Sequence, residues 1–579
     1  MTAVNHPIQG SGHASPSTPA AMTDFWLVVW SLTLAIGWVL PNHYPPWSSF
    51  HFEAWSAATF ALAALAVTLR SAAPVRWSGL AFLVAVLMCV PSIQLMTDIV
   101  VTPGNSWIST AYLLAFLLAV LTGTRWAASG EQATSALFLA IGIGSIVSVG
   151  LQLHQWLGLD RLDIWSMGGG FERPYANFGQ PNQLATFLIW GLLAGAWAHV
   201  LGKLRAAIAI VFAMFLLFGL ALTASRTAWI AIAILVIAVW GWRRVWPDRR
   251  FAWVVTLLAA YFGVCVATSG WIGQMLTGNV TSDADLVARM TDESRPAIWS
   301  LFVEAAMQRP WFGYGWNQVG MAQVAVADYQ PALHVPFTQS HNLFLDLVLW
   351  CGVPIGLTVS AFLVVWMVRR IARVRTPEQA LLILLLLVVA NHAMLELPLH
   401  YAYFLLPAGL VMGILESRQQ VKTMFASRRR VVLTLWAIGV ALLILMVRDY
   451  WRIERSYETL RFEWARIETA PAIEPDVLLL TQWRDFFRLN RLEPTTGMGD
   501  AELRSLENTA AMFPSIGFVQ RLAVALALND RPQDAAKWMR RVCNIAAQVQ
   551  CDTVKSAWVR MAAGDARIAA VPWPQDVAH

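Results

Sequence analysis

Charged residues are scarce in this sequence. Only 13% of its 579 residues are Asp, Glu, Lys or Arg, whereas 57% are apolar. A soluble domain carries roughly 25% charged residues, so this composition excludes an ordinary soluble protein. Uncharged apolar runs recur along the chain, and ~17–25 residues are enough to cross a hydrocarbon core of ~30 Å. We therefore predict an all-α polytopic membrane protein with thirteen transmembrane helices, at residues 24–40, 54–69, 77–96, 107–122, 133–153, 183–201, 206–222, 227–242, 251–268, 342–368, 379–395, 399–415 and 430–447.

Ionisable residues are almost missing from these runs. A transporter coupled to protons or ions needs carboxylates or histidines near the middle of the membrane, in interrupted helices. The nearest carboxylates instead lie at span ends: Asp346 just inside the tenth span and Glu396 between the eleventh and twelfth. This distribution favours a site at one membrane surface over a route through the membrane.

Cysteine is also rare, with five residues in the chain, and no Cys/His spacing matches a metal site. We expect neither a metal nor a cofactor. Cys89, Cys265 and Cys351 fall in predicted spans, where a thiol usually acts as a small apolar side chain. Cys543 and Cys551 lie eight residues apart near the C-terminus, where they can form a disulfide or remain two free thiols.

Lys and Arg are absent from the first 22 residues, which are rich in Ser, Pro and Thr. We expect residues 1–22 to form a disordered cytoplasmic tail. Because the basic segment of a signal peptide is missing, the first helix is expected to remain uncleaved.

The positive charges that are present indicate the orientation. Six alternate connections between spans hold eighteen Lys and Arg, and the intervening connections before the last span hold six. Cytoplasmic connections carry the excess of positive charge, so we place the N-terminus in the cytoplasm and the C-terminus outside. This predicts a transmembrane domain at residues 23–447 with a large outer loop at 269–341, then a helical outer domain at 448–579. The net charge of +6 reflects this bias and does not indicate nucleic acid.

Two segments outside the predicted spans have helical patterns of their own. The long loop contains "ESRPAIWSLFVEAAMQRPWFGYG", and the outer domain contains "FPSIGFVQRLAVALALNDRPQDAAKWMRRVC". The second predicts a helical hairpin of the tetratricopeptide type, with Pro532 in the first turn of its second helix. The first predicts an amphipathic helix, whose apolar face consists of Ile298, Leu301, Phe302, Ala305 and Ala306.

Three arginines on the outer side are candidate ligands for an anion. Arg226 lies in a short connection, and Arg289 and Arg295 lie in the long loop. A guanidinium group binds two phosphate oxygens at once and keeps its charge. The alternatives are an interfacial arginine at position 226 and a structural ion pair between Arg295 and Glu293.

His341, in "TQSHNLFLDL", is the candidate general base. Its unperturbed pKa of about 6.5 suits proton transfer near neutral pH, although a lone histidine at a helix start is more often structural. Asp346, five residues further on, lies roughly 140° around a helix from it. We therefore expect another carboxylate, Glu396, to orient the imidazole.

Amide side chains gather in "RPYANFGQPNQLATFLIW", where Asn177, Gln180 and Asn182 precede the sixth span. Carboxamides form hydrogen bonds with sugar hydroxyls, an acceptor or phosphate oxygens without repelling an anion. The alternative is that they satisfy the N–H groups of the helix that starts at Pro181.

A further polar cluster occurs in "NHAMLELPLHYAYFLLP", which adds Tyr401 and Tyr403 to the outer face beside Glu396. Tyrosine is common at membrane interfaces for other reasons, so neither tyrosine is assigned on this pattern alone.

Together these residues fit one reaction. Outside the cytoplasm no nucleotide-activated donor is available, so an activated group must arrive on a lipid carrier. A polyprenyl diphosphate places its diphosphate at the level of the lipid headgroups. Arginines there would hold it and stabilise the negative charge that grows as it leaves, while His341 takes a proton from an acceptor hydroxyl.

Five motifs carry a family resemblance: "PNHYPPWSSFHFEAW", "RPYANFGQPNQLAT", "TASRTAW", "SRPAIWSLFVEAAMQRPWFGYGWNQ" and "SHNLFLDLVLWCGVPIGL". They resemble the bacterial O-oligosaccharyltransferases of the pilin-glycosylating (PglL) type, in a superfamily shared with O-antigen ligases and polymerases. The resemblance covers most of the chain. It implies an inner-membrane enzyme with a GT-C-like helical fold and a periplasmic active site. Such an enzyme transfers a glycan en bloc from undecaprenyl diphosphate to Ser or Thr of exported proteins such as pilins.

The resemblance also implies roles for single residues. His341 matches the essential histidine of the family, Arg226 and Arg295 match its diphosphate-binding arginines, and Gln180 matches the glutamine of its amide block. Tyr401 or Tyr403 matches a family tyrosine, and the resemblance does not choose between them. Pro296, directly after Arg295, departs from the expected pattern and leaves the orientation of that arginine open.

Two other functions stay open at this point. An O-antigen ligase or polymerase would use the same donor with lipid A core or another glycan as acceptor. A transporter for lipid-linked glycan would belong to a different class, and the uncharged spans argue against it.

Overall fold

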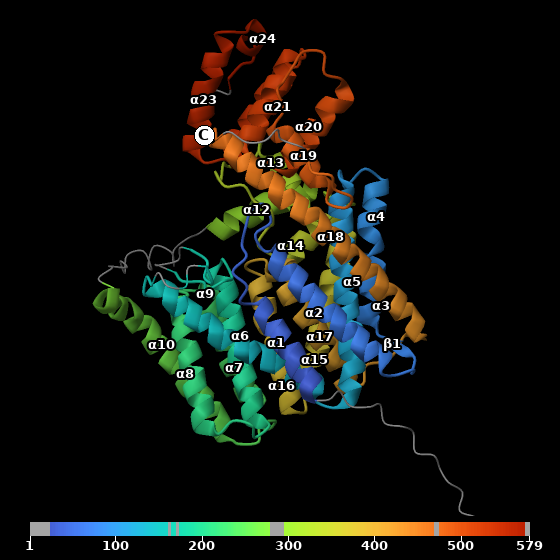
Figure 1. Ribbon diagram of the computed structural model, residues 1–579, viewed down its shortest axis with the longest axis vertical. Coiled ribbons are helices and arrows are strands. Elements are labelled where there is room, and N and C mark those ends of the chain that lie inside the picture. Colours follow the sequence, from blue (N-terminus) through green and yellow to red (C-terminus); the bar gives the residue numbers. More distant parts are fainter. Residues whose placement is uncertain are drawn as a thin grey trace, which may run out of the picture.

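The computed structural model describes residues 24–159, 162, 164–168, 173–277, 294–467 and 474–573. These residues are mostly helical, and one short antiparallel pair joins β1 (Val75–Trp77) to β2 (Phe425–Ser427). Figure 1 shows a bundle of long helices with a smaller helical domain at one end, reached through α18. The bundle helices are α1 (Asp24–Gly37), α2 (Phe50–Leu69), α3 (Gly79–Leu87), α4 (Cys89–Met96), α5 (Pro103–Trp126), α6 (Gln132–Trp156), α7 (Pro181–Val200), α8 (Ala206–Leu222), α9 (Arg226–Gly241), α10 (Arg250–Thr277), α14 (Leu343–Cys351), α15 (Val353–Ile371), α16 (Pro377–Ala393), α17 (Ala402–Arg418) and α18 (Arg429–Trp464).

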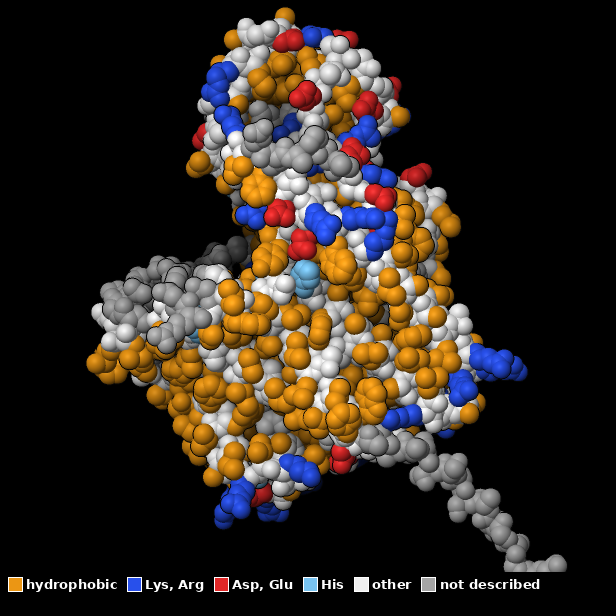
Figure 2. All heavy atoms as spheres, in the orientation of Figure 1, with side chains coloured by type: hydrophobic (Ala, Val, Ile, Leu, Met, Phe, Trp, Pro, Cys, Tyr) orange, Lys and Arg blue, Asp and Glu red, His pale blue; other side chains and the backbone are white. Residues whose placement is uncertain are grey.

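The predicted apolar runs all fall on helices of this bundle. Among the described residues, eight helical segments are long and apolar enough to cross a membrane, and α1, α8, α9 and α16 are apolar but shorter. Figure 2 shows a broad hydrophobic band across the visible face of the bundle, with charged side chains gathered at its lower end and below the smaller domain. The chain is therefore a multi-pass, all-α membrane protein; the count of thirteen spans stays a prediction. The expected tail at residues 1–22 lies outside the described residues.

One predicted span, 342–368, is wrong as a continuous helix. It is broken into α14 and α15 at Gly352, which has a φ of 82°. A Cβ atom there would lie 2.3 Å from the carbonyl oxygen of Trp311. The backbone N–H of Val353 donates to the carbonyl of Pro310 at 2.7 Å. The long loop thus docks into the break, a contact between distant segments that no apolar pattern encodes.

Close packing of α5 against α17 forms the centre of the bundle. Small residues make this approach possible, as in other membrane helix pairs. A Cβ atom on Gly413 would lie 2.0 Å from the carbonyl oxygen of Val120, and one on Gly123 would lie 2.1 Å from that of Leu410. The N-terminus of α17, which carries the two predicted tyrosines, is positioned by this contact.

The long loop is largely helical where it is described. It contains α12 (Ser294–Gln308) and α13 (Val319–Val326). All five apolar residues of the predicted amphipathic face are buried, in a cluster with α14 side chains. The predicted helix and its buried face are confirmed, although Val303 and Met307 make the exposed face partly apolar too. Arg295 lies in the first turn of α12.

The C-terminal domain is helical, as predicted, and α18 extends into it from the bundle. It comprises α19 (Thr481–Asn490), α20 (Asp500–Met512), α21 (Ile516–Leu528), α22 (Pro532–Ile545), α23 (Gln548–Ala562) and α24 (Ala566–Ala569). The predicted hairpin is α21 and α22, with Pro532 as the first residue of α22. A disulfide joins Cys543 to Cys551 and so links α22 to α23. The likeness to a tetratricopeptide unit stays a prediction.

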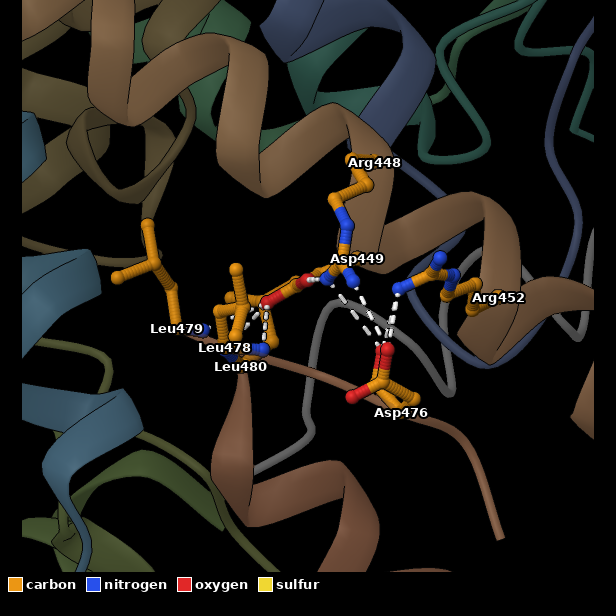
Figure 3. A network of polar contacts seen from close by, with 7 residues as sticks. All are labelled: Arg448, Asp449, Arg452, Asp476, Leu478, Leu479 and Leu480. Atoms are coloured by element: carbon orange, nitrogen blue, oxygen red, sulfur yellow. Dashed lines mark hydrogen bonds and ion pairs between the residues drawn. The ribbon is translucent and has the colours of Figure 1, made fainter.

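A buried carboxylate in α18 fastens this domain to that helix. Asp449 accepts the backbone N–H groups of residues 478–480 at 2.6–3.1 Å and forms an ion pair with Arg448 at 2.7 Å (Figure 3). Asp476 contacts Arg448 and Arg452 from the solvent side. The chain leading into α19 is therefore held against the outer part of α18.

Candidate active site

Glu396 is the centre of the predicted polar face. It lies between α16 and a short 3-10 turn, η2 (Pro398–His400), with 11% of its side chain exposed. His341 Nδ1 lies 3.1 Å from one carboxylate oxygen, and Gln180 Nε2 lies 3.3 Å from the same oxygen. Arg295 Nη2 and Asn182 Nδ2 each lie 3.4 Å from the other oxygen. Four predicted site residues, from three separate segments, therefore meet at one carboxylate.

The contact with Glu396 fixes the orientation of the His341 imidazole. Because Nδ1 faces the carboxylate, we assign the proton to Nδ1, which leaves Nε2 as the acceptor. A carboxylate that holds the far nitrogen of a histidine in this way is the usual support for a general base. The expectation that Glu396, and not Asp346, contacts this imidazole is confirmed.

Asp346 supports His341 in another way. Its carboxylate accepts the backbone N–H of Ser340 at 2.8 Å, and His400 Nε2 lies 3.4 Å away. His341 itself has a φ of 58°, which is uncommon for a residue with a side chain. The Asn342 side chain caps α14 by accepting two backbone N–H groups. The turn that presents the imidazole is thus fixed on both sides.

Opposing effects act on the pKa of Glu396. Burial alone would raise the pKa of this carboxyl, but the hydrogen bond and charge of His341, with the charge of Arg295, lower it below its usual value. Glu396 therefore stays ionised at neutral pH and attracts the cationic groups of the site.

The amide block contributes a chain of hydrogen bonds that leads away from Glu396. Gln180 precedes α7 but makes no side-chain cap bond to it, so the helix-capping alternative does not hold for this residue. Instead its Oε1 accepts from Gln183 Nε2 at 2.9 Å, and Gln183 accepts from the Tyr403 hydroxyl. Asn182 Oδ1 accepts from Ser225 at 2.8 Å. Gln183 was missed as a site residue, although it belongs to the same amide-rich stretch.

Asn177 does not share this role. It is fully buried, and its amide donates to the carbonyls of Val39 and Trp165 at 2.8 and 2.9 Å. Its oxygen accepts the N–H of Met167 at 3.0 Å. The prediction of Asn177 as a substrate ligand is corrected here: its polar atoms are all used to hold the loop before α7 together.

Arg226 is the first residue of α9, at the edge of the same region. Its neighbours tie this helix start to the site: the Ser225 hydroxyl bonds to Asn182, and Asn391 donates to the carbonyl of Thr227 at 3.1 Å. A helix N-terminus attracts anions, and Arg226 adds a full positive charge there. Arg289 lies outside the described residues.

The two tyrosines have different surroundings. Their rings stack with centroids 5.2 Å apart. Both hydroxyls interact with Gln183, but Tyr403 is only 2% exposed, whereas Tyr401 lines a large cavity. Tyr401 is the tyrosine that a bound ligand could contact.

The cavity beside the site has a volume of about 1120 Å³. Gln339, His400 and Tyr401 line it near Glu396. Toward the bundle it is lined by apolar side chains of α15 and α16. It therefore joins a polar end, formed by residues close in sequence to His341 and Glu396, to an apolar end between bundle helices.

Comparison with known proteins assigns the family. The chain is 30% identical over 529 residues to a general O-oligosaccharyltransferase of Acinetobacter baylyi, which covers 89% of this chain and 91% of that protein. The chain belongs to the O-oligosaccharyltransferase family. It is also 28% identical over 268 residues to a ComP-specific O-oligosaccharyltransferase of the same organism, covering 45% of this chain and 48% of that protein. The resemblance found in the sequence is confirmed, and the chain is an oligosaccharyltransferase enzyme.

Three family models match different segments of this oligosaccharyltransferase, and each segment contains residues of the site. The protein glycosylation ligase model matches residues 174–199, which include Gln180 and Asn182. The O-antigen ligase model matches residues 209–359, and the model for the C-terminal part of a virulence factor membrane-bound polymerase matches residues 380–550. His341 and Glu396 fall in these two segments, so their contact connects two separately recognised parts of the chain.

Proposed function

We propose that this enzyme transfers a preassembled glycan en bloc from undecaprenyl diphosphate to Ser or Thr hydroxyls of exported proteins such as pilins. The site would lie at the periplasmic surface of the bacterial inner membrane, with the N-terminus in the cytoplasm and the C-terminal domain in the periplasm. One observation carries the proposal. A histidine, an arginine and two amides meet at Glu396, at the ends of predicted spans.

In this mechanism His341 acts as general base. Its Nε2 takes the proton of the acceptor hydroxyl while the hydroxyl oxygen attacks the anomeric carbon of the first sugar. The bond from that carbon to the diphosphate oxygen breaks, and undecaprenyl diphosphate leaves with the electron pair. Glu396 stabilises the imidazolium that forms, and the proton then passes to the leaving diphosphate or to solvent.

The arginines serve the leaving group. Arg295 contacts Glu396 with one nitrogen, so its other N–H groups can reach a phosphate oxygen. Arg226 and the N-terminus of α9 would hold the second phosphate, and Arg289 belongs to the same set in this proposal. Fixed positive groups that face growing negative charge lower the barrier without a metal.

The remaining polar residues would position the sugar. Gln180 and Asn182 are neutral, so they can bond to sugar hydroxyls or phosphate oxygens whatever the pH. Tyr401 would contact the ligand from the cavity wall. The apolar end of the cavity between α15 and α16 suits the polyprenyl chain of the donor.

The test must also include a non-protein acceptor, because two family matches favour one. The O-antigen ligase and polymerase models cover residues 209–359 and 380–550. Lipid A core or another glycan could therefore replace the protein acceptor at the same site. A lipid-linked glycan transporter would not need His341 and Glu396 in contact.

Co-expression with a lipid-linked glycan pathway and an exported pilin-like protein tests the proposal. We expect glycan on the protein, and about a 10²–10⁴-fold lower rate for His341→Ala. His199→Ala, at the other end of α7, is the matched control and should retain the rate. If the glycan appears on lipopolysaccharide instead, the chain acts as an O-antigen ligase and the proposed protein acceptor is wrong. Glycan on neither acceptor, with normal membrane insertion, would overturn the enzyme mechanism.

A further inference from the structure

The C-terminal domain forms part of the wall of the large cavity beside the candidate site. Four of its side chains line the cavity: Gln482 and Trp483 from α19, Met512 from the end of α20, and Phe513 just after it. The same cavity is lined by His400 and Tyr401 beside Glu396. The domain is therefore a wall of the cavity as well as an attachment at the end of the bundle.

Two polar atoms in this wall are buried without a hydrogen-bond partner among the described residues. They are Oε1 of Gln482 and Nε1 of Trp483. Gln482 is 4% exposed, and its amide lies against Gly104 of α5, where a Cβ atom would overlap it. Buried polar side chains nearly always have partners, and an unpaired one needs an explanation. Both side chains line the cavity, although the Gln482 oxygen itself faces Gly104.

The surrounding wall is aromatic and neutral. The Trp483 and Phe513 rings lie 5.8 Å apart with their planes tilted by 38°. Asn105 and Ser109 of α5 line the cavity on the bundle side. Glu53 is the one acidic side chain in the described lining, and its oxygens are already bound by neighbouring donors. An ionic ligand would find no countercharge here.

From this wall we infer a binding subsite for the distal sugars of the donor glycan, those furthest from the diphosphate. The apolar face of a sugar ring packs on an aromatic side chain, while its hydroxyls exchange hydrogen bonds with amides and an indole N–H. A cavity of about 1120 Å³ exceeds the ~300–1,000 Å³ of an ordinary ligand pocket, as an oligosaccharide requires. The inference rests on the proposed function, because the donor must be a lipid-linked glycan.

Donors of two lengths separate this subsite from the reaction centre. The probes are a polyprenyl diphosphate with one sugar and the same carrier with the full oligosaccharide. For Trp483→Ala and Gln482→Ala, we expect KM for the long donor to rise about tenfold, the scale of one lost hydrogen bond and one lost ring contact. The one-sugar donor should react at the wild-type rate, and Trp483→Phe should recover part of the loss. Trp464→Ala, on exposed α18 surface, is the matched control.

Three outcomes would overturn the subsite. Equal losses with both donors would assign Trp483 and Gln482 to packing of the domain. A higher KM for the acceptor protein, independent of glycan length, would make this wall an acceptor surface. If the wild-type chain transfers neither glycan, the proposed function fails. Titration calorimetry with the free oligosaccharide then decides the subsite, which is overturned if wild type and Trp483→Ala bind it equally.

Discussion

Two carboxylates, Glu396 and Asp449, are both buried in polar networks outside the predicted spans, yet their partners differ. Asp449 is fully buried and binds three backbone N–H groups and Arg448 at 2.6–3.1 Å. Glu396 is 11% exposed and binds four side chains at 3.1–3.4 Å. Short bonds to the backbone hold a fold, whereas longer contacts between side chains can be exchanged for a substrate.

The difference also shows in the origin of the partners. The backbone groups bound by Asp449 belong to one continuous stretch, residues 478–480. The partners of Glu396 come from the starts of α7, α12 and α14, each an element packed independently into the bundle. A carboxylate that collects such groups sets their relative positions, which is what a site needs from a supporting residue.

The largest effect should come from Glu396→Gln. The amide keeps the size of the side chain but loses the charge that orients His341 and attracts Arg295. We expect glycan transfer to fall about 10²–10⁴-fold, as when the carboxylate behind a catalytic histidine is made neutral, with little change in melting temperature. In vitro transfer on purified protein, with a melt of the same preparation, measures both.

Glu378→Gln is the matched control for that experiment. Glu378 is also buried, and it binds Thr134 and Arg418 at 2.6 and 2.8 Å on another side of the bundle. Its variant should lose stability and keep its rate per folded molecule. If Glu378→Gln loses transfer, or Glu396→Gln keeps full activity, Glu396 cannot be distinguished from a carboxylate that only stabilises the fold.

The comparison also shows what the sequence could and could not predict. Apolar runs predicted the bundle helices, because burial in lipid constrains composition over a whole span. The chemistry of their side chains predicted that His341, Arg295, Gln180 and Asn182 would lie on one face. The structure places them together.

What failed depended on contacts between distant segments. Asn177 has the same chemistry as Asn182, but its amide is used by backbone groups of Val39 and Trp165. The break at Gly352 is set by the docking of Trp311. Neither contact has a local pattern, so single-sequence reasoning could not separate the structural amide from the site amide.

The next effect in size is on stability. Asp449→Ala leaves three backbone N–H groups without their acceptor and removes one of the two carboxylates that contact Arg448. Each buried N–H group left unpaired costs about 1–3 kcal/mol, so we expect a clearly lower melting temperature and loosening of α19 from α18. Thermal unfolding followed by hydrogen exchange at residues 478–480 measures this.

Asp476→Ala is the control within the same network (Figure 3). Asp476 contacts the same Arg448, but 74% of its side chain is exposed. An exposed ion pair contributes at most about 1 kcal/mol, so its loss should hardly change the melting temperature. Equal destabilisation by both variants would show that Arg448, and not the buried carboxylate, holds the junction.

The smallest effect should appear when pH is varied. The pKa of Glu396 is lower in the folded chain than its ordinary value of 4.5. Its ion-pair contribution is therefore fully present above the unfolded pKa and is lost as pH falls through the lowered folded pKa. The melting temperatures of wild type and Glu396→Gln should differ by a constant amount, about 2 °C or less, from pH 8 to pH 5. They should converge as pH falls below 4.5. No difference between the two proteins anywhere from pH 8 to pH 5 would mean that Glu396 is already neutral in the folded chain, and the orientation of His341 by a carboxylate would fail with it.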